Sequence, residues 1–224
     1  MVKVLHLYYD LLNLYGENAN LRALIRALEG QEVKVQVDFK SLGDEININN
    51  YDFIYVGSGC YEDLQLVKED FKRFSDDIKK YIDSNKFILA TGNGTDLFAG
   101  ILKYKTKHID FRIVGDQLFK CSLIDKDVIG FQNRDMVMYD INEDSLFTVT
   151  SGTGSEPEVT TEGIIKNHFY GTYLLGPILI RNPYLLEYLV KELFKFNKIK
   201  YKEVKQGIAY KAYEQALVNF GTYE

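Results

Sequence analysis

Residues 86–100, KFILATGNGTDLFAG, are the stretch of the chain best suited to mount a reactive side chain. An apolar strand at 87–90 leads into a glycine turn, and the turn leads into a predicted helix that Thr95 or Asp96 would cap. In α/β enzymes a sharp strand–turn–helix holds a nucleophile above the sheet, where amides at the helix start face the substrate. The residue at the tip is Gly92, however, which has no side chain with which to attack.

A second glycine turn, Gly57-Ser58-Gly59, directly follows an apolar strand at 52–56. Ligands of parallel α/β sheets bind beyond the carboxyl ends of the strands, so both turns are predicted to lie on one rim. Glycines there let backbone amides approach a ligand closely, and Asn93 and Gly94 are candidates to present amides to an anion. The alternative is that the turns are only tight connections, because the third glycine of a dinucleotide fingerprint is absent.

The chain has two cysteines and three histidines, which are scattered without metal-ligand spacing. We therefore expect no metal site, no disulfide framework and a cytoplasmic location. Cys60 lies on the predicted rim and is the one candidate for a relocated nucleophile, but no basic neighbour is evident. Cys121 is interpreted as a core residue and His168 as a structural histidine. His6 is interpreted as a strand residue and His108 as a surface residue.

Residues 1–100 alternate strands with helices, which predicts a parallel sheet covered by helices on both faces. The apolar positions of the first helix repeat at helical spacing after Asn18 or Asn20, either of which would cap it. The predicted strands cover 2–7, 33–37, 52–56 and 87–90, and the predicted helices cover 18–29 and 67–82.

The second half of the chain has a different pattern of predicted elements. Short β-like runs from 109 to 180 indicate an antiparallel insertion or sheet extension. Asn182-Pro183 then opens a helix, since proline suits a first helical turn. A basic linker at 195–205 precedes a last helix at 206–220. The whole pattern predicts one domain, 1–224, with a three-layer α/β/α, flavodoxin-like fold, a parallel central sheet and an antiparallel extension.

Composition excludes some partners. The formal net charge of −5 argues against nucleic-acid binding, which needs a basic face. No apolar run reaches the roughly 18–20 residues that span a bilayer. The start of the chain has a strand pattern with an early aspartate and is not typical of a signal peptide.

Four separated stretches resemble the class I glutamine amidotransferase-like family, in its cobyric-acid-synthase-like branch, and within it the GatD glutaminase subunits of lipid II isoglutaminyl synthases. HLYYDLLNLYGENANL (6–21) resembles the branch's N-terminal segment, and YVGSGCYEDLQ (55–65) its oxyanion loop. ATGNGTDLFAG (90–100) takes the place of the nucleophile elbow, and TEGIIKNHFYGTYLLGPILIRNP (161–183) is similar to the C-terminal motif. GFQNRD (130–135) also resembles a family segment, GFENH.

The resemblance implies a cysteine at the elbow that attacks the glutamine amide and a histidine that activates the thiol. These positions are Gly92 and Leu175 here, so both groups are absent together and the site is interpreted as degenerate. Glycine also relaxes the strained backbone of such an elbow. The remaining pocket and oxyanion candidates are Gly57, Ser58, Gly59, Asn93 and Gly94.

Three functions stay open, none of which needs a cofactor. In the first, the chain lacks glutaminase activity and is the partner of a Mur-ligase-like, ATP-binding synthetase that amidates a peptidoglycan precursor, or a corrinoid in the cobalamin-related part of the branch. In the second, it is an active glutaminase that supplies ammonia with a displaced or engineered nucleophile. In the third, its altered pocket binds a small molecule, either an amino acid such as glutamine or a phosphate.

Overall fold

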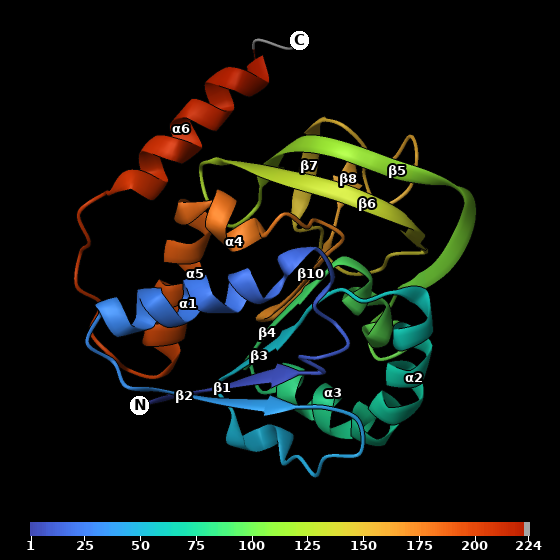
Figure 1. Cartoon of the computed structure of the whole chain (residues 1–224), viewed down its shortest axis with the longest axis horizontal. Coiled ribbons are helices and arrows are strands. Elements are labelled where there is room, and N and C mark those ends of the chain that lie inside the picture. Colours follow the sequence, from blue (N-terminus) through green and yellow to red (C-terminus); the bar gives the residue numbers. More distant parts are fainter. Residues whose placement is uncertain (222–224) are drawn as a thin grey trace.

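A six-stranded sheet with the order β2-β1-β3-β4-β10-β9 forms the centre of the computed structural model, which describes residues 1–221 (Figure 1). All neighbours in it pair in parallel except β9, which is antiparallel to β10. The strands are β1 (Val2–Leu7), β2 (Val35–Lys40), β3 (Phe53–Val56), β4 (Phe87–Thr91), β9 (Ile164–Lys166) and β10 (Phe169–Thr172).

Helices cover both faces of this sheet because its central strands are apolar on both sides. In β4, Phe87 and Leu89 join the core under one set of helices, whereas Ile88 and Ala90 join the core on the opposite face. Such continuous apolar strands are typical of buried parallel sheets. The first helical layer contains α1 (Asn18–Gly30), α4 (Ile178–Arg181) and α5 (Pro183–Phe196), and the second contains α2 (Tyr61–Phe71), η3 (Lys72–Phe74) and α3 (Ser75–Asp83).

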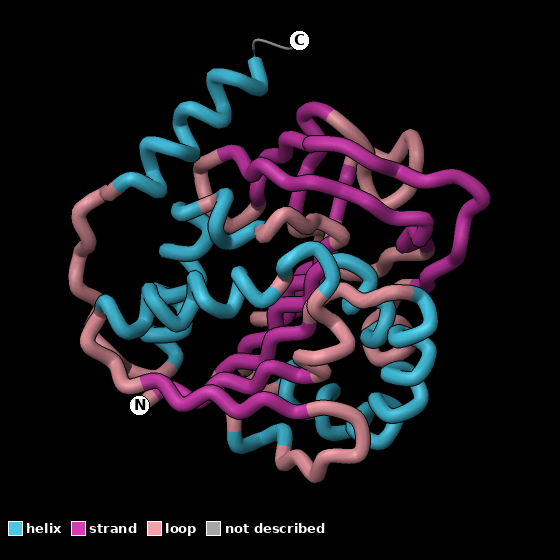
Figure 2. Tube along the Cα trace, in the orientation of Figure 1, coloured by secondary structure: helices cyan, strands magenta, loops and turns pink. Residues whose placement is uncertain are grey.

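A separate four-stranded antiparallel sheet, with the order β6-β5-β7-β8, lies between β4 and β9 in the chain (Figure 2). Its long β5–β6 ribbon is interrupted where the register shifts between His108 and Ile113. A bridge from Phe131 to Leu175 links this sheet to the segment that follows β10. The strands are β5 (Lys105–Cys121), β6 (Asp127–Tyr139), β7 (Phe147–Ser151) and β8 (Thr161–Glu162).

The last helix, α6 (Ile208–Gly221), projects from the body of the molecule (Figure 1). Tyr213 is its one fully buried side chain among the described residues, and its hydroxyl donates to the carbonyl oxygen of Asp127. The Tyr210 hydroxyl donates to Glu187 on α5. Within residues 1–221, no helix is long and apolar enough to cross a membrane.

The predicted fold class is confirmed, but several local predictions were wrong. The helix expected at 67–82 is interrupted by the 3-10 turn at Lys72–Phe74. The strand expected at 33–37 begins at Val35, and residues 178–180, expected in a strand, belong to the helix Ile178–Arg181. Pro183 does occupy the first turn of α5, as predicted.

The predicted helix caps were also wrong. Neither Asn18 nor Asn20 caps α1, and the Asn18 amide instead donates to the Asn13 side chain. After β4 the chain forms a 3-10 helix, η4 (Gly92–Phe98), without a side-chain cap. Thr95 instead donates its hydroxyl to the Gly92 carbonyl, and Asp96 accepts a hydrogen bond from a tyrosine hydroxyl. The side chains of Thr95 and Asp96 therefore make hydrogen bonds to other groups and do not cap the amides at the helix start.

His6 is a fully buried histidine in β1 with no hydrogen-bond partner on either ring nitrogen within the described chain. Its ring lies among aromatic rings, with centroids 5.2 Å from Tyr55 and 5.8 Å from Phe39. Burial lowers the pKa of His6 to about 4, against a smaller opposing attraction from Asp10. The native state therefore holds this ring neutral.

The depressed pKa of His6 predicts loss of stability in acid. The unfolded chain binds the proton near pH 6.5 and the native state only near pH 4, so stability is lost as the pH falls through this window. We expect His6→Leu to remove about 2 kcal/mol of the difference in unfolding free energy between pH 7 and pH 5. Urea unfolding of both proteins at the two pH values measures this, and His108→Leu controls for loss of a histidine. Parallel pH dependences of His6→Leu and wild type would contradict it.

Candidate functional site

A cavity of about 230 Å³ lies beyond the carboxyl ends of β3 and β4, where the two glycine turns were expected to meet. Ser58 and Gly59 reach it from the turn after β3, and Gly92 and Asn93 from the turn after β4. Leu175 reaches it from the segment after β10. The structure thus brings together residues of the two glycine turns, which the sequence placed on one rim, and adds Leu175 from a third stretch.

The Asn93 side chain joins the two turns. Its Oδ1 accepts the Gly59 amide at 2.9 Å and the Ser58 hydroxyl at 3.1 Å, and its Nδ2 donates to the Gly59 carbonyl at 2.8 Å. The Gly59 amide, which was expected to face an anion, is therefore already paired within the protein. A ligand that used it would have to displace Asn93.

Gly57 and Gly94 do not line the cavity. A Cβ built on Gly94 would lie 2.0 Å from the Gly57 carbonyl oxygen, and one on Gly57 would lie 2.2 Å from the Leu12 carbonyl oxygen. Real Cβ atoms do not approach backbone this closely, so both positions require glycine for packing. Gly94 is explained by backbone contact between the two turns, and Gly57 by contact with the backbone of Leu12.

Gly92 has a φ of +56°, the left-handed region that favours glycine. A Cβ there would lie 2.5 Å from Ser58 Oγ and 2.8 Å from Leu175 Cδ2. The volume into which a nucleophilic side chain would project is thus occupied by these two residues. Gly92 and Leu175, the two positions at which the motifs lose their reactive groups, are neighbours in space.

No histidine lines the cavity in the described part of the chain. His168 Nδ1 lies 2.6 Å from the Asn85 carbonyl oxygen, and its ring stacks on Phe87 with a centroid distance of 4.1 Å. His108 is exposed on β5 and His6 is in the sheet core. The pocket therefore lacks an imidazole to act as a general base.

Cys60 lies at the cavity rim as the N-cap residue of α2. Its thiol donates to the Asp63 carboxylate at 3.0 Å, and this hydrogen bond raises the pKa of the thiol. A nucleophilic cysteine needs the opposite shift, toward thiolate. Cys121, predicted to be a core residue, is half-buried on β5, and burial raises the pKa of its thiol.

Beneath the turns, Glu17 is a buried carboxylic acid that ties the site to α1. Its Oε2 accepts hydrogen bonds from the hydroxyls of Thr91 and Tyr55, and its carboxylate also accepts from the backbone of Gly176. Thr91 precedes Gly92 and Gly176 follows Leu175, so one carboxyl group is bonded to a neighbour of each of these two positions. Burial raises the pKa of Glu17 to about 7.

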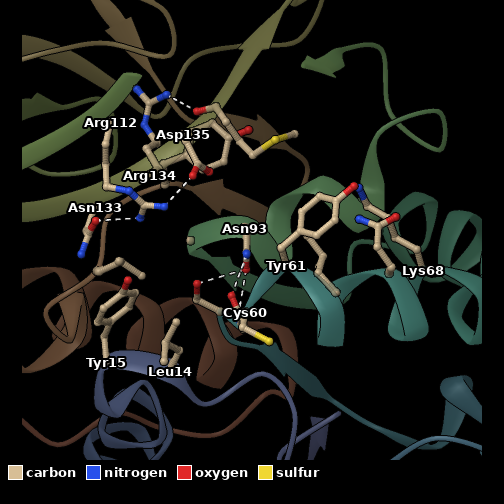
Figure 3. Close-up of a pocket in the computed structure, with 18 residues that line it drawn as sticks. Leu14, Tyr15, Cys60, Tyr61, Lys68, Asn93, Arg112, Asn133, Arg134 and Asp135 are labelled. Carbon is tan, nitrogen blue, oxygen red and sulfur yellow. Dashed lines mark hydrogen bonds and ion pairs between the residues drawn. The ribbon is translucent and has the colours of Figure 1, made fainter. Parts of the chain in front are cut away.

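The wall of the cavity is charged, which the sequence alone did not reveal. Figure 3 shows that Arg112, Asn133, Arg134 and Asp135 lie on one side, with Tyr61 and Lys68 on another. Three of them come from the segment GFQNRD, which the motif comparison singled out without a role. That segment was the available signal in the sequence for the charged wall. The residues that α2 and β5 add to the wall are brought there only by the tertiary fold.

Curated relatives and solved structures resemble the chain. No family model matches it. It is 28% identical to the lipid II isoglutaminyl synthase (glutamine-hydrolyzing) subunit GatD of Streptococcus pneumoniae, over 96% of this chain and 87% of the relative. It is 27% identical to the subunit of the same name from Staphylococcus aureus, over 84% of this chain and 83% of the relative.

The solved structures share the fold. PurLQS from Thermotoga maritima superposes with a TM-score of 0.62 and 12% identity, over 88% of this chain and 99% of that one. A glutamine amidotransferase from the same organism superposes with a TM-score of 0.56 and 13% identity, over 96% of this chain and 90% of that one. These comparisons confirm the resemblance and the fold expected from the motifs.

The filled volume at Gly92 predicts a steric penalty for any side chain there. Gly100 is the matched control, because it has a φ of +90° but a Cβ there would have no neighbour within 4 Å. We expect Gly92→Ala to lower the unfolding free energy by about 1–3 kcal/mol more than Gly100→Ala, since only Gly92→Ala adds overpacking to backbone strain. Equal losses of unfolding free energy in the two variants, measured by urea unfolding, would contradict the prediction, because Ser58 and Leu175 would then move aside without cost.

The raised pKa of Glu17 predicts a stability change of the opposite sign to that of His6. The native state keeps the Glu17 proton up to about pH 7 and the unfolded chain only to about 4.5, so stability falls as the pH rises through this window. We expect the unfolding free energy of Glu17→Gln to fall by about 2–3 kcal/mol less than that of wild type when the pH is raised from 5 to 8. Glu29→Gln, at an exposed position of α1, controls for the removed charge, and coinciding pH dependences of Glu17→Gln and wild type would refute the prediction.

Proposed function

Because the chain is a relative of the GatD subunits with the fold of the class I glutamine amidotransferases, we propose that it is a GatD-like subunit without glutaminase activity of its own. In this role it acts as the structural or regulatory partner of a Mur-ligase-like amide synthetase. Both relatives are named for lipid II, which favours a cell-wall precursor over a corrinoid as the acceptor. The free thiols of Cys60 and Cys121 suit the cytoplasm.

The single observation that carries this proposal is the contact between Gly92 and Leu175. Glutamine hydrolysis by a thiol mechanism needs a nucleophile and a general base within hydrogen-bond reach of one another. These two positions face each other here, with a Cβ on Gly92 only 2.8 Å from Leu175 Cδ2, and neither has a reactive group. Ser58 fills the remaining space, so the loss extends to the volume that a thiol would need.

The competing proposal is an active glutaminase that uses Cys60. Three observations disfavour it. The pKa of the Cys60 thiol is raised, the thiol donates a hydrogen bond to the Asp63 carboxylate, and no histidine lines the cavity in the described chain. An unactivated thiol at neutral pH has only a small thiolate fraction. The geometry therefore supports a pocket without glutaminase activity better than one in which Cys60 is a relocated nucleophile.

The first test is ammonia release from glutamine by the purified chain. We expect no rate above background, because the chain lacks both the nucleophile and the base. Wild type is measured beside Cys60→Ser and the double variant Gly92→Cys/Leu175→His. Turnover by wild type that disappears in Cys60→Ser would overturn the proposal, whereas turnover by the double variant alone would identify the pocket as the former glutamine site.

The second test concerns the partner. Co-expressed with a Mur-ligase-like synthetase, the chain is expected to co-purify with it as a stable complex. That complex is expected to amidate its acceptor with added ammonium salt and not with glutamine, because no ammonia is generated in this subunit. Absence of a complex, or amidation supported by glutamine, would contradict the proposed role.

A further inference from the structure

The linker that joins α5 to α6 is strongly basic. Residues 195–205 contain five lysines and one glutamate, in a chain whose formal net charge is −5. Figure 1 shows that the linker runs along the outer edge of the molecule, from the end of α5 to the start of α6. None of these described residues lines the cavity beyond β3 and β4, so the candidate site does not explain their charge.

The linker is held against the body of the protein. Ile199 is half-buried and packs against the core on the α1 and α5 side of the central sheet. The Lys202 backbone exchanges two hydrogen bonds of 2.8 Å with the Gln31 side chain at the end of α1. Lys198 and Lys200, on either side of Ile199, are exposed. The lysines are therefore presented on the surface by a backbone that is fixed at several points.

Three of the five lysines in the linker are unpaired. Within residues 1–221, the ammonium groups of Lys198, Lys200 and Lys205 make no hydrogen bond or ion pair. The other two lysines are paired with glutamates of α5 and of the turn after α1. The glutamate of the linker, Glu203, lies 3.6 Å from the Lys191 ammonium of α5. The linker thus presents positive charge that the described chain leaves without a counter-ion.

Exposed apolar side chains lie beside these lysines. Val204 is 53% exposed, and Ile208, the first residue of α6, is 82% exposed. Val204 also lines a groove of about 240 Å³, together with Leu186 and Val190 of α5. Apolar groups bordered by charged ones mark sites that bind a protein or a membrane.

The residue types favour a lipid surface over an acidic protein. All five cations are lysines, which are hydrated point charges, whereas the planar fork of arginine suits pairing of fixed geometry. Protein interfaces are depleted in lysine and enriched in arginine. Clusters of about four to eight basic residues bind the negative surface of anionic bilayers, and neighbouring apolar side chains enter the headgroup region. The linker and the start of α6 combine both features.

We propose that the linker and the start of α6 bind the surface of an anionic phospholipid bilayer. Lys198, Lys200 and Lys205 lie at the lipid phosphates, and Val204 and Ile208 enter between the headgroups. Such attachment is peripheral and reversible, and it weakens at high salt because most of the attraction is electrostatic.

The first test is co-sedimentation of the purified full chain with vesicles. We expect binding to vesicles of equal parts phosphatidylcholine and phosphatidylglycerol, and none to phosphatidylcholine alone. The triple variant Lys198→Gln/Lys200→Gln/Lys205→Gln is expected to bind at least about tenfold more weakly, because each basic residue near an anionic surface strengthens binding about fivefold.

The matched control is Lys72→Gln/Lys79→Gln/Lys80→Gln, which removes the same charge from exposed positions of η3 and α3 on the opposite face of the sheet. Its binding is expected to stay within about twofold of wild type, because charges far from the bilayer are screened by salt. Equal weakening in the two triple variants, or no sedimentation of wild type with the anionic vesicles, would overturn the proposal.

The second test reports insertion directly. The chain contains no tryptophan, so a single introduced indole reports its own surroundings. Ile208→Trp is expected to show blue-shifted emission with the anionic vesicles, because indole enters the boundary between headgroups and acyl chains. Leu66→Trp, at a 57% exposed position of α2 across the sheet, is the control and is expected to show no shift. If the linker instead serves an acidic protein, vesicles leave both emissions unchanged, and that result would overturn the proposal.

Discussion

The close backbone contact between the turns after β3 and β4 is the constraint on which the rest of the site depends. Gly94 can approach the Gly57 carbonyl only because Gly94 has no side chain in the way. Asn93 then fastens the contact with hydrogen bonds to both Ser58 and Gly59. The floor of the cavity is therefore rigid, already satisfied in its hydrogen bonds, and shaped by packing.

This floor determines how the chain can depart from its relatives without losing its fold. A reactive elbow stores strain at its tip, and Gly92 relieves that strain while Ser58 and Leu175 fill the vacated volume. Glu17 fixes the same region from below through Thr91 and the backbone of Gly176. The scaffold persists because its stability comes from buried strands and this network, neither of which requires a thiol or an imidazole.

The charged side chains of the cavity lie on its wall and not on its floor. The antiparallel sheet places Arg112 and Arg134 opposite α2, where Lys68 lies, so that a chain of net charge −5 presents basic groups around one small cavity. Arg134 is buried against Tyr173, its hydrogen bonds go to neutral oxygens, and the carboxyl groups of Glu162 and Asp96 attract its charge from farther away.

The sequence by itself determined the alternation of strands and helices, the buried strands that lead into the glycine turns, and the absence of a side chain at Gly92. These follow from local periodicity and residue type, which need no knowledge of distant neighbours. Only the tertiary structure decided that Asn93 faces the other turn, that Asp96 bonds Tyr173 instead of capping a helix, and that Lys68 and Arg134 share a cavity. Such pairings join residues far apart in the chain, and their partners leave no local trace because long-range packing selects them.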